Sequence, residues 1–302
     1  MRIAFAGTPV AALPTLQALI NSPHTIEFVI TRPDAPKGRG RELAPSEVAE
    51  LAQANGIKVI KTSDLTEVAS RVAGLDAVVV VAYGGLVPKA LLDVPKFGWL
   101  NVHFSLLPHW RGAAPVQHAI MAGDDVTGIT TFRIEEALDS GPVLAYITTS
   151  IGKEETAGQL LDRLSVEGGN LALATLQGLE NGSMLPLEQP LDGVSYAPKI
   201  TTEMARINWQ EPALVVARKI RAMTPAPGAW TMSGPDRYKL SPVKLVPEVT
   251  HLSSGQLVLV DEHVYVGTGS HAVELDQIQL PGKTFTQATN WARNLKMDLV
   301  FE

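Results

Sequence analysis

The sequence AVVVVA at residues 77–82 is built only from alanine and valine. A strand without polar positions is typical of a parallel sheet that helices cover on both faces. A second short apolar strand is predicted at residues 3–6, close to the start of the sequence. The run at 77–82 therefore predicts a fully buried strand within a mainly parallel sheet.

Predicted strands and helices alternate on both sides of this run. Thr8 and Pro9 favour the start of the first helix, because a threonine can cap it and a proline fits its first turn. This alternation is typical of a Rossmann-like α/β sheet, in which ligands bind beyond the carboxyl ends of the strands. We predict that this domain spans residues 1–188. Its further strands are expected at residues 26–30, 57–60, 100–103, 129–134 and 143–148, and its helices at 10–21, 46–55, 65–72, 113–122 and 157–179.

The alternation ends near residue 180, and a different pattern follows. Residues 189–206 have no apolar periodicity and contain Pro190, Gly193 and Pro198, which predicts a linker. Several short strands then indicate a small OB-like β-barrel over residues 207–302, a surface suited to nucleic acid. The expected strands are at 229–232, 239–246, 256–260, 263–266 and 272–280, between helices at 212–223 and 284–292.

Composition excludes several classes of protein. The sequence has 302 residues, 45% of them hydrophobic and 19% charged, which is typical of a globular chain rather than a disordered one. It contains no cysteine, which excludes disulfide scaffolds, thiolate metal sites and cysteine nucleophiles. No apolar run reaches the roughly 18 residues of a membrane span, and the N-terminal apolar run is too short for a signal peptide. We therefore expect a cytoplasmic protein.

The charge distribution leaves two interpretations open. The net charge of −6 argues on average against nucleic-acid binding. Residues 32–41 and 218–244 are nevertheless strongly basic, and each stretch contains a single acidic residue. Each stretch is either a solvated basic face or a contact for a polyanion. Their cations are Arg32, Lys37, Arg39, Arg41, Arg218, Lys219, Arg221, Arg237, Lys239 and Lys244.

Familiar nucleotide, metal and hydrolase motifs are incomplete. Residues 7–9 follow the first strand but lack the further glycines of a dinucleotide fingerprint. Residues 282–284 resemble the end of a P-loop, but Gln277 stands where its first glycine is needed. The histidines between residues 103 and 118 form no helical pair with i, i+4 spacing, so no metal site is predicted. Ser105 lacks the Gly-x-Ser-x-Gly setting of a hydrolase nucleophile.

A dense polar segment follows the predicted strand at residues 100–103. Asn101 and His103 lie two residues apart, so their side chains point to the same side of an extended strand. Asp139 lies in a predicted turn between the next two strands, and it comes near His103 if those strands are neighbours. Such a trio suits transfer between two bound substrates: the amide and imidazole hold an oxyanion, while the carboxylate raises the histidine pKa and helps move a proton. The alternative is a buried polar turn beside a capped helix.

The sequence NVHFSLLPHWRGAAP at residues 101–115 and the turn LDSG at 138–141 resemble the 10-formyltetrahydrofolate-dependent formyltransferases. The resemblance covers essentially the whole chain. It implies a catalytic trio of Asn101, His103 and Asp139, with 10-formyltetrahydrofolate as the formyl donor. It also implies that the folate lies beside the turn and along Ser105, Leu106, Leu107 and Pro108.

Three further features resemble the branch of this family that formylates methionyl initiator tRNA. These are the opening sequence at residues 2–9, the basic loop at 32–41 and the sequence YAPKI at 196–200. The resemblance implies that the methionyl α-amine attacks the formyl carbon, and we expect a monomer that does not bind membranes. It implies tRNA contacts from the basic loop and the C-terminal domain, through Arg32, Lys37, Arg39, Arg41, Arg218, Lys219 and Arg221.

Three other functions share parts of this pattern. A formyltransferase acting on an amino sugar nucleotide would have the same trio but no use for the basic loop at 32–41. A noncatalytic tRNA-binding protein would have no need for intact Asn101, His103 and Asp139. A folate-dependent hydrolase that releases formate would share both the fold and the trio.

Overall fold

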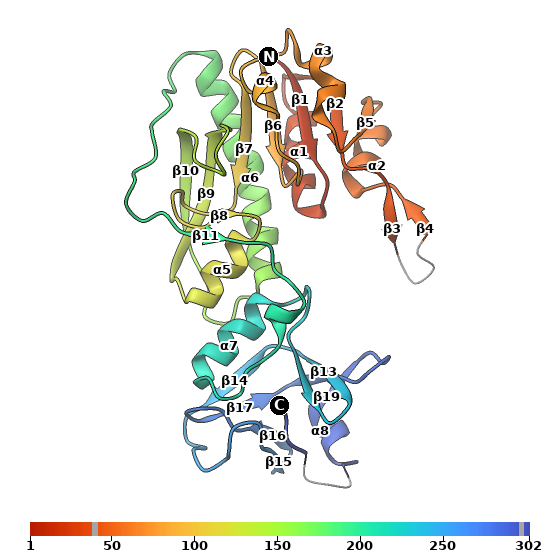
Figure 1. The fold of residues 1–302 in the computed structure, drawn as a ribbon, viewed down its shortest axis with the longest axis vertical. Coiled ribbons are helices and arrows are strands. Elements are labelled where there is room, and N and C mark those ends of the chain that lie inside the picture. Colours follow the sequence, from red (N-terminus) through yellow and green to blue (C-terminus); the bar gives the residue numbers. More distant parts are fainter. Residues whose placement is uncertain (38–41, 296–298) are drawn as a thin grey trace. The chain divides into compact units, whose positions relative to one another are not determined.

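The computed structural model describes residues 1–37, 42–295 and 299–302, which form two compact units (Figure 1). The N-terminal unit contains Met1–Pro115, Val126–Ser150 and Leu161–Pro198. The C-terminal unit contains the remainder: Val116–Asp125, Ile151–Leu160 and Lys199–Glu302. Two short segments that precede residue 161 thus belong to the C-terminal unit. The domain ranges expected from the sequence, 1–188 and 207–302 with a linker at 189–206, stay predictions.

A seven-stranded sheet is the centre of the N-terminal unit. Its strand order is β10-β9-β7-β6-β1-β2-β5 (Figure 1). The run from β7 to β5 is parallel, whereas β9 pairs antiparallel with both β7 and β10. The mainly parallel sheet expected from the sequence is therefore confirmed. The strands are β1 (Arg2–Gly7), β2 (Thr25–Thr31), β5 (Val59–Lys61), β6 (Ala77–Val81), β7 (Trp99–His103), β9 (Val126–Arg133) and β10 (Val143–Ser150).

Both faces of this sheet are covered. Every residue of β6 is buried, as its apolar sequence predicts. On one face, Ala4 and Val78 belong to a buried cluster with Leu65, Val72 and Leu91 from the covering helices. These covering helices are η2 (Leu65–Val68), α3 (Ala69–Val72) and α4 (Lys89–Leu92).

Helix α6 (Ala157–Glu180) covers the opposite face. A methyl group placed on Gly168 would meet Val102 of β7, and one on Gly169 would meet the backbone of α1 (Leu13–Ile20). Val102 points away from the cluster around Trp99, because side chains alternate along a strand. The two glycines thus let α6 approach both the sheet and α1. The other helices of this unit are η1 (Val10–Ala12) and α2 (Glu47–Ala54), whereas α5 (Pro115–Ala122) lies almost wholly in a segment of the C-terminal unit.

Two further sheets of the N-terminal unit have two strands each. Strand β3 (Ala35–Lys37) pairs antiparallel with β4 (Glu42–Ala44). Strand β8 (Arg111–Gly112) pairs in parallel with β11 (Tyr196–Ala197). The end of the polar segment that follows β7 is therefore bound to the stretch expected to be a linker.

The C-terminal unit contains two four-stranded antiparallel sheets, β12-β13-β18-β19 and β14-β17-β16-β15. Its core is a single buried cluster in which Trp209 and Phe301 stack with ring centroids 5.6 Å apart. The small β domain expected from the sequence is confirmed, and its closure into an OB-like barrel stays a prediction. Its elements are η3 (Glu203–Ala205), α7 (Ala213–Ala222), β12 (Trp230–Ser233), β13 (Asp236–Leu240), β14 (Val243–Val246), β15 (Leu257–Val260), β16 (His263–Val266), β17 (Ala272–Leu275), β18 (Gln277–Gln279), β19 (Phe285–Gln287) and α8 (Ala288–Ala292).

Two strands expected from the sequence are each split in the structure. The expected strand 239–246 is interrupted at Ser241 and Pro242, and its two parts belong to different sheets as β13 and β14. Proline has no N–H to donate to a strand ladder, so the chain changes sheets there. The expected strand 272–280 likewise separates at Asp276 into β17 and β18. The apolar pattern therefore predicted strands but not the change of sheet.

None of the helices within residues 1–37, 42–295 and 299–302 is both long and apolar enough to cross a membrane.

Candidate active site

Strand β7 carries Asn101 and His103. Asn101 lies opposite Val80 of β6 and Phe132 of β9, while His103 lies opposite Thr130 of β9. His103 ends the strand with 5% of its surface exposed, and Asn101 is partly exposed. Because the two residues are two positions apart, their side chains share one face of the strand. An amide and an imidazole therefore lie together where β7 ends.

The imidazole of His103 lies between a carbonyl and a carboxylate. Its Nε2 is 2.9 Å from the carbonyl oxygen of Trp110, which can only accept, so we infer that Nε2 carries a hydrogen and donates it. Its Nδ1 is 3.9 Å from Oδ2 of Asp139, too far for a hydrogen bond but close enough for charge attraction. The structure thus brings together the histidine and the aspartate that the sequence singled out.

Burial lowers the pKa of His103 below its ordinary value of 6.5. The charge of Asp139 and the hydrogen bond to Trp110 both raise that pKa, but burial has the larger effect. The carboxylate of Asp139 therefore raises the pKa of His103, as expected from the sequence, but burial decides that the pKa is lowered overall. A neutral imidazole near pH 7 can take up a proton at Nδ1, on the side that faces Asp139.

Asp139 is held through both its main chain and its side chain. Its φ of +46° lies in the left-handed region, which aspartate tolerates better than most residues. Its Oδ2 accepts a hydrogen bond from the N–H of Gly112 at 2.7 Å, and its carbonyl accepts one from Nε2 of Gln189 at 2.8 Å. A side chain at Gly141 would collide with the carbonyl oxygen of Arg133, so the turn needs glycine there.

The residues expected to bind folate form a tight loop after β7. Ser105 is fully buried, and its hydroxyl donates to a main-chain carbonyl four residues later at 2.6 Å. The hydroxyl of Thr130 donates to the carbonyl of Ser105 at 2.7 Å and accepts from the N–H of Leu107 at 3.2 Å. Leu106 and Leu107 are partly exposed, whereas Pro108 is buried. The two leucines are thus only partly covered, with Leu106 lying against Gly128 of β9, while Ser105 and Thr130 hold the shape of the loop.

The basic residues expected to contact tRNA from the N-terminal unit are partly described. Arg39 and Arg41 lie outside the described residues. Nζ of Lys37 lies 2.7 Å from the carboxylate of a glutamate at the start of α2. The guanidinium of Arg32 lies 5.8 Å from the centre of the Tyr83 ring. Both described cations therefore already have a partner within the protein.

Helix α7 carries the three basic residues expected to contact tRNA from the C-terminal unit. Nη1 of Arg221 donates to two main-chain carbonyls of the segment Ile151–Leu160, at 2.8 and 3.3 Å. Lys219 lines a cavity of about 270 Å³, and partial burial lowers its pKa. Arg218 lies against Gly123. Arg221 in particular makes contacts that stabilise the C-terminal unit itself.

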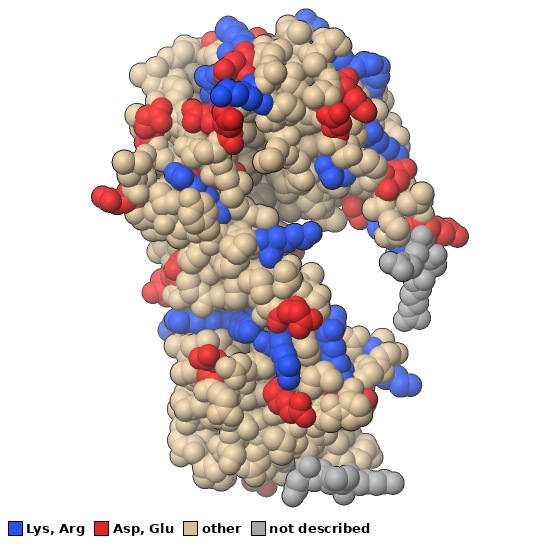
Figure 2. Space-filling model, in the orientation of Figure 1, with Lys and Arg blue, Asp and Glu red and all other residues tan. Residues whose placement is uncertain are grey.

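Further cations gather around an indole in the same unit. The guanidinium of Arg237 lies 3.9 Å from the centre of the Trp230 ring, and that of Arg206 lies 5.7 Å from it. Figure 2 shows Lys and Arg side chains over α7 and β13. Sequence reasoning placed Arg237 in a basic stretch without seeing its contact with Trp230, because that contact depends on the folded sheet.

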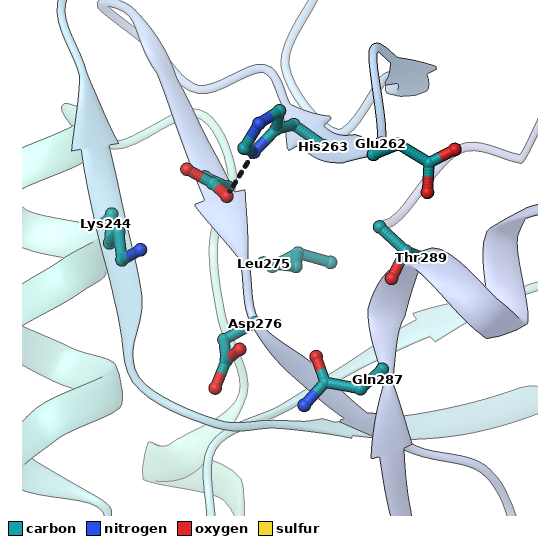
Figure 3. Close-up of a pocket in the computed structure, with 8 residues that line it drawn as sticks. Lys244, Glu262, His263, Leu275, Asp276, Gln287 and Thr289 are labelled. Atoms are coloured by element: carbon teal, nitrogen blue, oxygen red, sulfur yellow. Dashed lines mark hydrogen bonds and ion pairs between the residues drawn. The ribbon is translucent and has the colours of Figure 1, made fainter.

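A separate pocket of about 150 Å³ in the C-terminal unit is acidic (Figure 3). Nδ1 of His263 lies 2.7 Å from Oε1 of Glu274, and three carboxylates outnumber a single lysine. This balance disfavours a phosphate group there. Among the residues that the structure describes, no cluster of His, Cys, Asp or Glu is arranged to hold a metal ion. The pocket is lined by Lys244, Glu262, His263, Glu274, Leu275, Asp276, Gln287 and Thr289.

Three residues of the candidate active site were missed by sequence reasoning. Arg111 lies in the segment that singled out the site, but nothing in the sequence indicated its contact with Gln189. Gln189 itself lies in a stretch without a regular apolar pattern, so its contacts could not be predicted from the sequence. Thr130 reads as an ordinary strand residue, and only the pairing of β7 with β9 places its hydroxyl beside Ser105.

The chain is similar to known proteins along its length. Residues 1–176 match the family described as formyl transferase, and residues 199–296 match the formyl transferase C-terminal domain. Over 303 residues the chain is 51% identical to a methionyl-tRNA formyltransferase of Streptomyces coelicolor, an alignment that covers 98% of this chain and 97% of that protein.

Solved structures show the same fold at lower identity. An N-formyltransferase from Helicobacter canadensis, in complex with folinic acid and dTDP-3-aminofucose, has a TM-score of 0.69 at 18% identity, over 90% of this chain and 97% of that one. HypX from Aquifex aeolicus, in complex with tetrahydrofolic acid, has a TM-score of 0.62 at 21% identity, over 96% of this chain and 46% of that one. From the family match over more than half of its residues and the near-complete alignment with a half-identical relative, the chain belongs to the formyl transferase family.

Proposed function

We propose that this protein transfers the formyl group of 10-formyltetrahydrofolate to the α-amine of methionyl initiator tRNA, giving N-formylmethionyl-tRNA. The name of the half-identical Streptomyces relative supports the acceptor. The folates named in two structures of similar fold support the donor. The observation that carries the proposal is the approach of His103 to Asp139, with Nδ1 and Oδ2 3.9 Å apart, beside Asn101 on β7.

In this reaction the amine nitrogen bonds to the formyl carbon, and the bond from that carbon to N10 of the folate breaks. The amide N–H of Asn101 suits the oxygen that becomes negative in the tetrahedral intermediate. The amine must lose a proton and N10 must gain one. Neutral His103 can accept that proton at Nδ1 and return it, because the charge of Asp139 stabilises the imidazolium in between.

The surroundings of the trio fit a folate. The partly exposed Leu106 and Leu107 offer an apolar wall for a flat pterin ring, and the buried Ser105 and Pro108 fix the loop that carries them. For the tRNA, cations in both units are proposed to meet phosphates, and each such contact adds salt dependence to binding. The proposed contacts are Arg32, Lys37, Arg39, Arg41, Arg218, Lys219 and Arg221. The enzyme is proposed to act in the cytoplasm as a monomer.

The test supplies 10-formyltetrahydrofolate with one of three acceptors: methionyl initiator tRNA, an amino sugar nucleotide, or water alone. Product formation on the tRNA, at a rate well above formate release, is the expected result. Formylation of the sugar amine alone would favour the sugar-nucleotide enzyme. Formate release alone would indicate a hydrolase, and tRNA binding without any formyl transfer would indicate a noncatalytic binding protein.

A further inference from the structure

We propose that Gln189 is a positioning residue that fixes the turn carrying Asp139, an inference that rests on the proposed function. Gln189 has 9% of its surface exposed. Its Nε2 donates to the carbonyl oxygens of Asp139 and Gly141, each at 2.8 Å. Its Oε1 accepts from Arg111, at 3.1 Å from Nε and at 2.6 Å from Nη2. One side-chain amide thus uses both of its N–H donors and accepts two hydrogen bonds at its oxygen.

These contacts join two sides of the candidate active site. Arg111 and Gly112 form β8, and the N–H of Gly112 donates to Oδ2 of Asp139 at 2.7 Å. Through Gln189, Arg111 is connected to the main chain of the same aspartate. The carboxylate and the main chain of Asp139 are therefore both held against β8.

The conformation of the turn explains why it needs this support. A φ of +46°, as Asp139 has, is a minority conformation even for aspartate, so contacts from the surrounding residues help to hold it. Without the two hydrogen bonds from Gln189, the turn can relax and carry the carboxylate away from Nδ1 of His103, now 3.9 Å distant. A shift of about 1 Å in an active site can lower a rate about a hundredfold. Gln189 therefore acts on the reaction through Asp139 rather than by touching a substrate.

Two substitutions distinguish the role of the N–H donors of the Gln189 side chain from the role of its accepting oxygen. Gln189→Met has a similar length and removes all four hydrogen bonds. Gln189→Glu still accepts from Arg111, but an ionised carboxylate cannot donate to the carbonyls of Asp139 and Gly141. The neighbouring Glu188 is exposed, so Glu188→Ala is a matched control.

The experiment measures kcat and KM for formylation of methionyl-tRNA. It also measures hydrogen exchange of the Gly112 amide, which donates a hydrogen bond to the carboxylate of Asp139. We expect both Gln189 variants to lower kcat at least about tenfold and to leave KM for tRNA and donor within about twofold. Exchange at Gly112 should speed up in both, while the amides of β6 stay protected as an internal reference. Glu188→Ala should match the wild type in every measurement.

Three results would overturn the inference. Wild-type kcat in Gln189→Glu would mean that orienting Arg111 is the only role of the side chain. Unchanged exchange at Gly112 in both variants would mean that the turn does not depend on Gln189. Equal loss of protection at Gly112 and in β6 would indicate global unfolding instead of a local role. If the wild type formylates no acceptor, the proposed function fails, and exchange at Gly112 still tests the contact of Gln189 with the turn.

Discussion

Replacing Asp139 by asparagine removes a charge from the candidate active site while keeping its shape. Asparagine has nearly the same volume, tolerates a left-handed φ, and can accept the hydrogen bond that Gly112 donates to Oδ2. The main-chain bond from Gln189 does not involve the side chain of residue 139. Asp139→Asn should therefore fold like the wild type and change mainly the electrostatic environment of His103.

The size of the effect follows from the separation of the two groups. Nδ1 of His103 and Oδ2 of Asp139 lie 3.9 Å apart and both side chains are mostly buried. At about that distance and an effective dielectric constant of about 20, unit charges attract by about 4 kcal/mol. If the imidazolium forms in the transition state, the upper limit of the loss in kcat is about a thousandfold. We expect a loss of about a hundredfold to a thousandfold.

The pH dependence of kcat provides a second measurement on the same variant. His103 faces one charged side chain among its described contacts, that of Asp139, and its other neighbours are the Trp110 carbonyl and the Phe132 ring, which do not titrate. Without Asp139 nothing charged opposes burial, so the pKa of His103 falls further. A base that works when neutral then loses activity at a lower pH, and the acid limb of the profile moves toward acid.

The assay is steady-state formylation of methionyl-tRNA at saturating donor between about pH 5 and pH 9, with the exposed Asp192→Asn as the control. A variant with kcat within about threefold of the wild type would refute the role of the Asp139 charge in catalysis. An acid limb that moved to higher pH would refute the assignment of that limb to His103.

Three further changes have expected outcomes. Because burial holds the pKa of His103 below 6.5, the unfolded chain binds more protons as pH falls through that value, and the wild type loses stability there. The free energy of unfolding, measured with urea, should fall less between about pH 7.5 and pH 5.5 in His103→Gln than in the wild type. The same dependence on pH in both proteins would contradict this. Gly141→Ala should lower the free energy of unfolding by about 1–3 kcal/mol and lower kcat, since its methyl group would collide with a carbonyl of β9. Arg221→Met should lower the free energy of unfolding by about 1–3 kcal/mol, because two hydrogen bonds are lost. An unchanged urea unfolding curve would contradict this.

The architecture could be predicted where burial alone decides it. Residues 77–81 of the alanine and valine run became β6, buried at every position, because no polar side chain competed with a fully covered strand. Ala82, expected in the same strand, lies beyond its end and is exposed. The prediction of one continuous strand at 239–246 was wrong at Pro242, where the chain passes from one sheet to another. A pattern of apolar residues reports whether a segment is extended and buried, but not which neighbour it pairs with. The change of sheet therefore could not be derived from it.

The candidate site shows the same division between local and distant contacts. Asn101 and His103 could be found because strand geometry puts residues two apart on one face. The approach of Asp139 needed one assumption, that the two strands on either side of its turn are neighbours. The structure confirms that β9 and β10 pair, and it also pairs β9 with β7, which carries His103. Gln189 could not be found, since it is 50 residues from Asp139 and lies in no regular pattern.

The pKa of His103 illustrates why a list of residue types is not yet a mechanism. From the sequence, a carboxylate beside an imidazole implies a raised pKa, and a charged histidine would be unable to accept the proton of an attacking amine. Burial at the end of β7 reverses the net shift, so the imidazole starts neutral. In the proposed reaction, the same carboxylate contributes after the proton has moved, when it stabilises the imidazolium. In that proposal, Asp139 accelerates the reaction because its carboxylate attracts the charged imidazolium more strongly than the neutral imidazole. This differential attraction requires the turn to keep Asp139 close to His103.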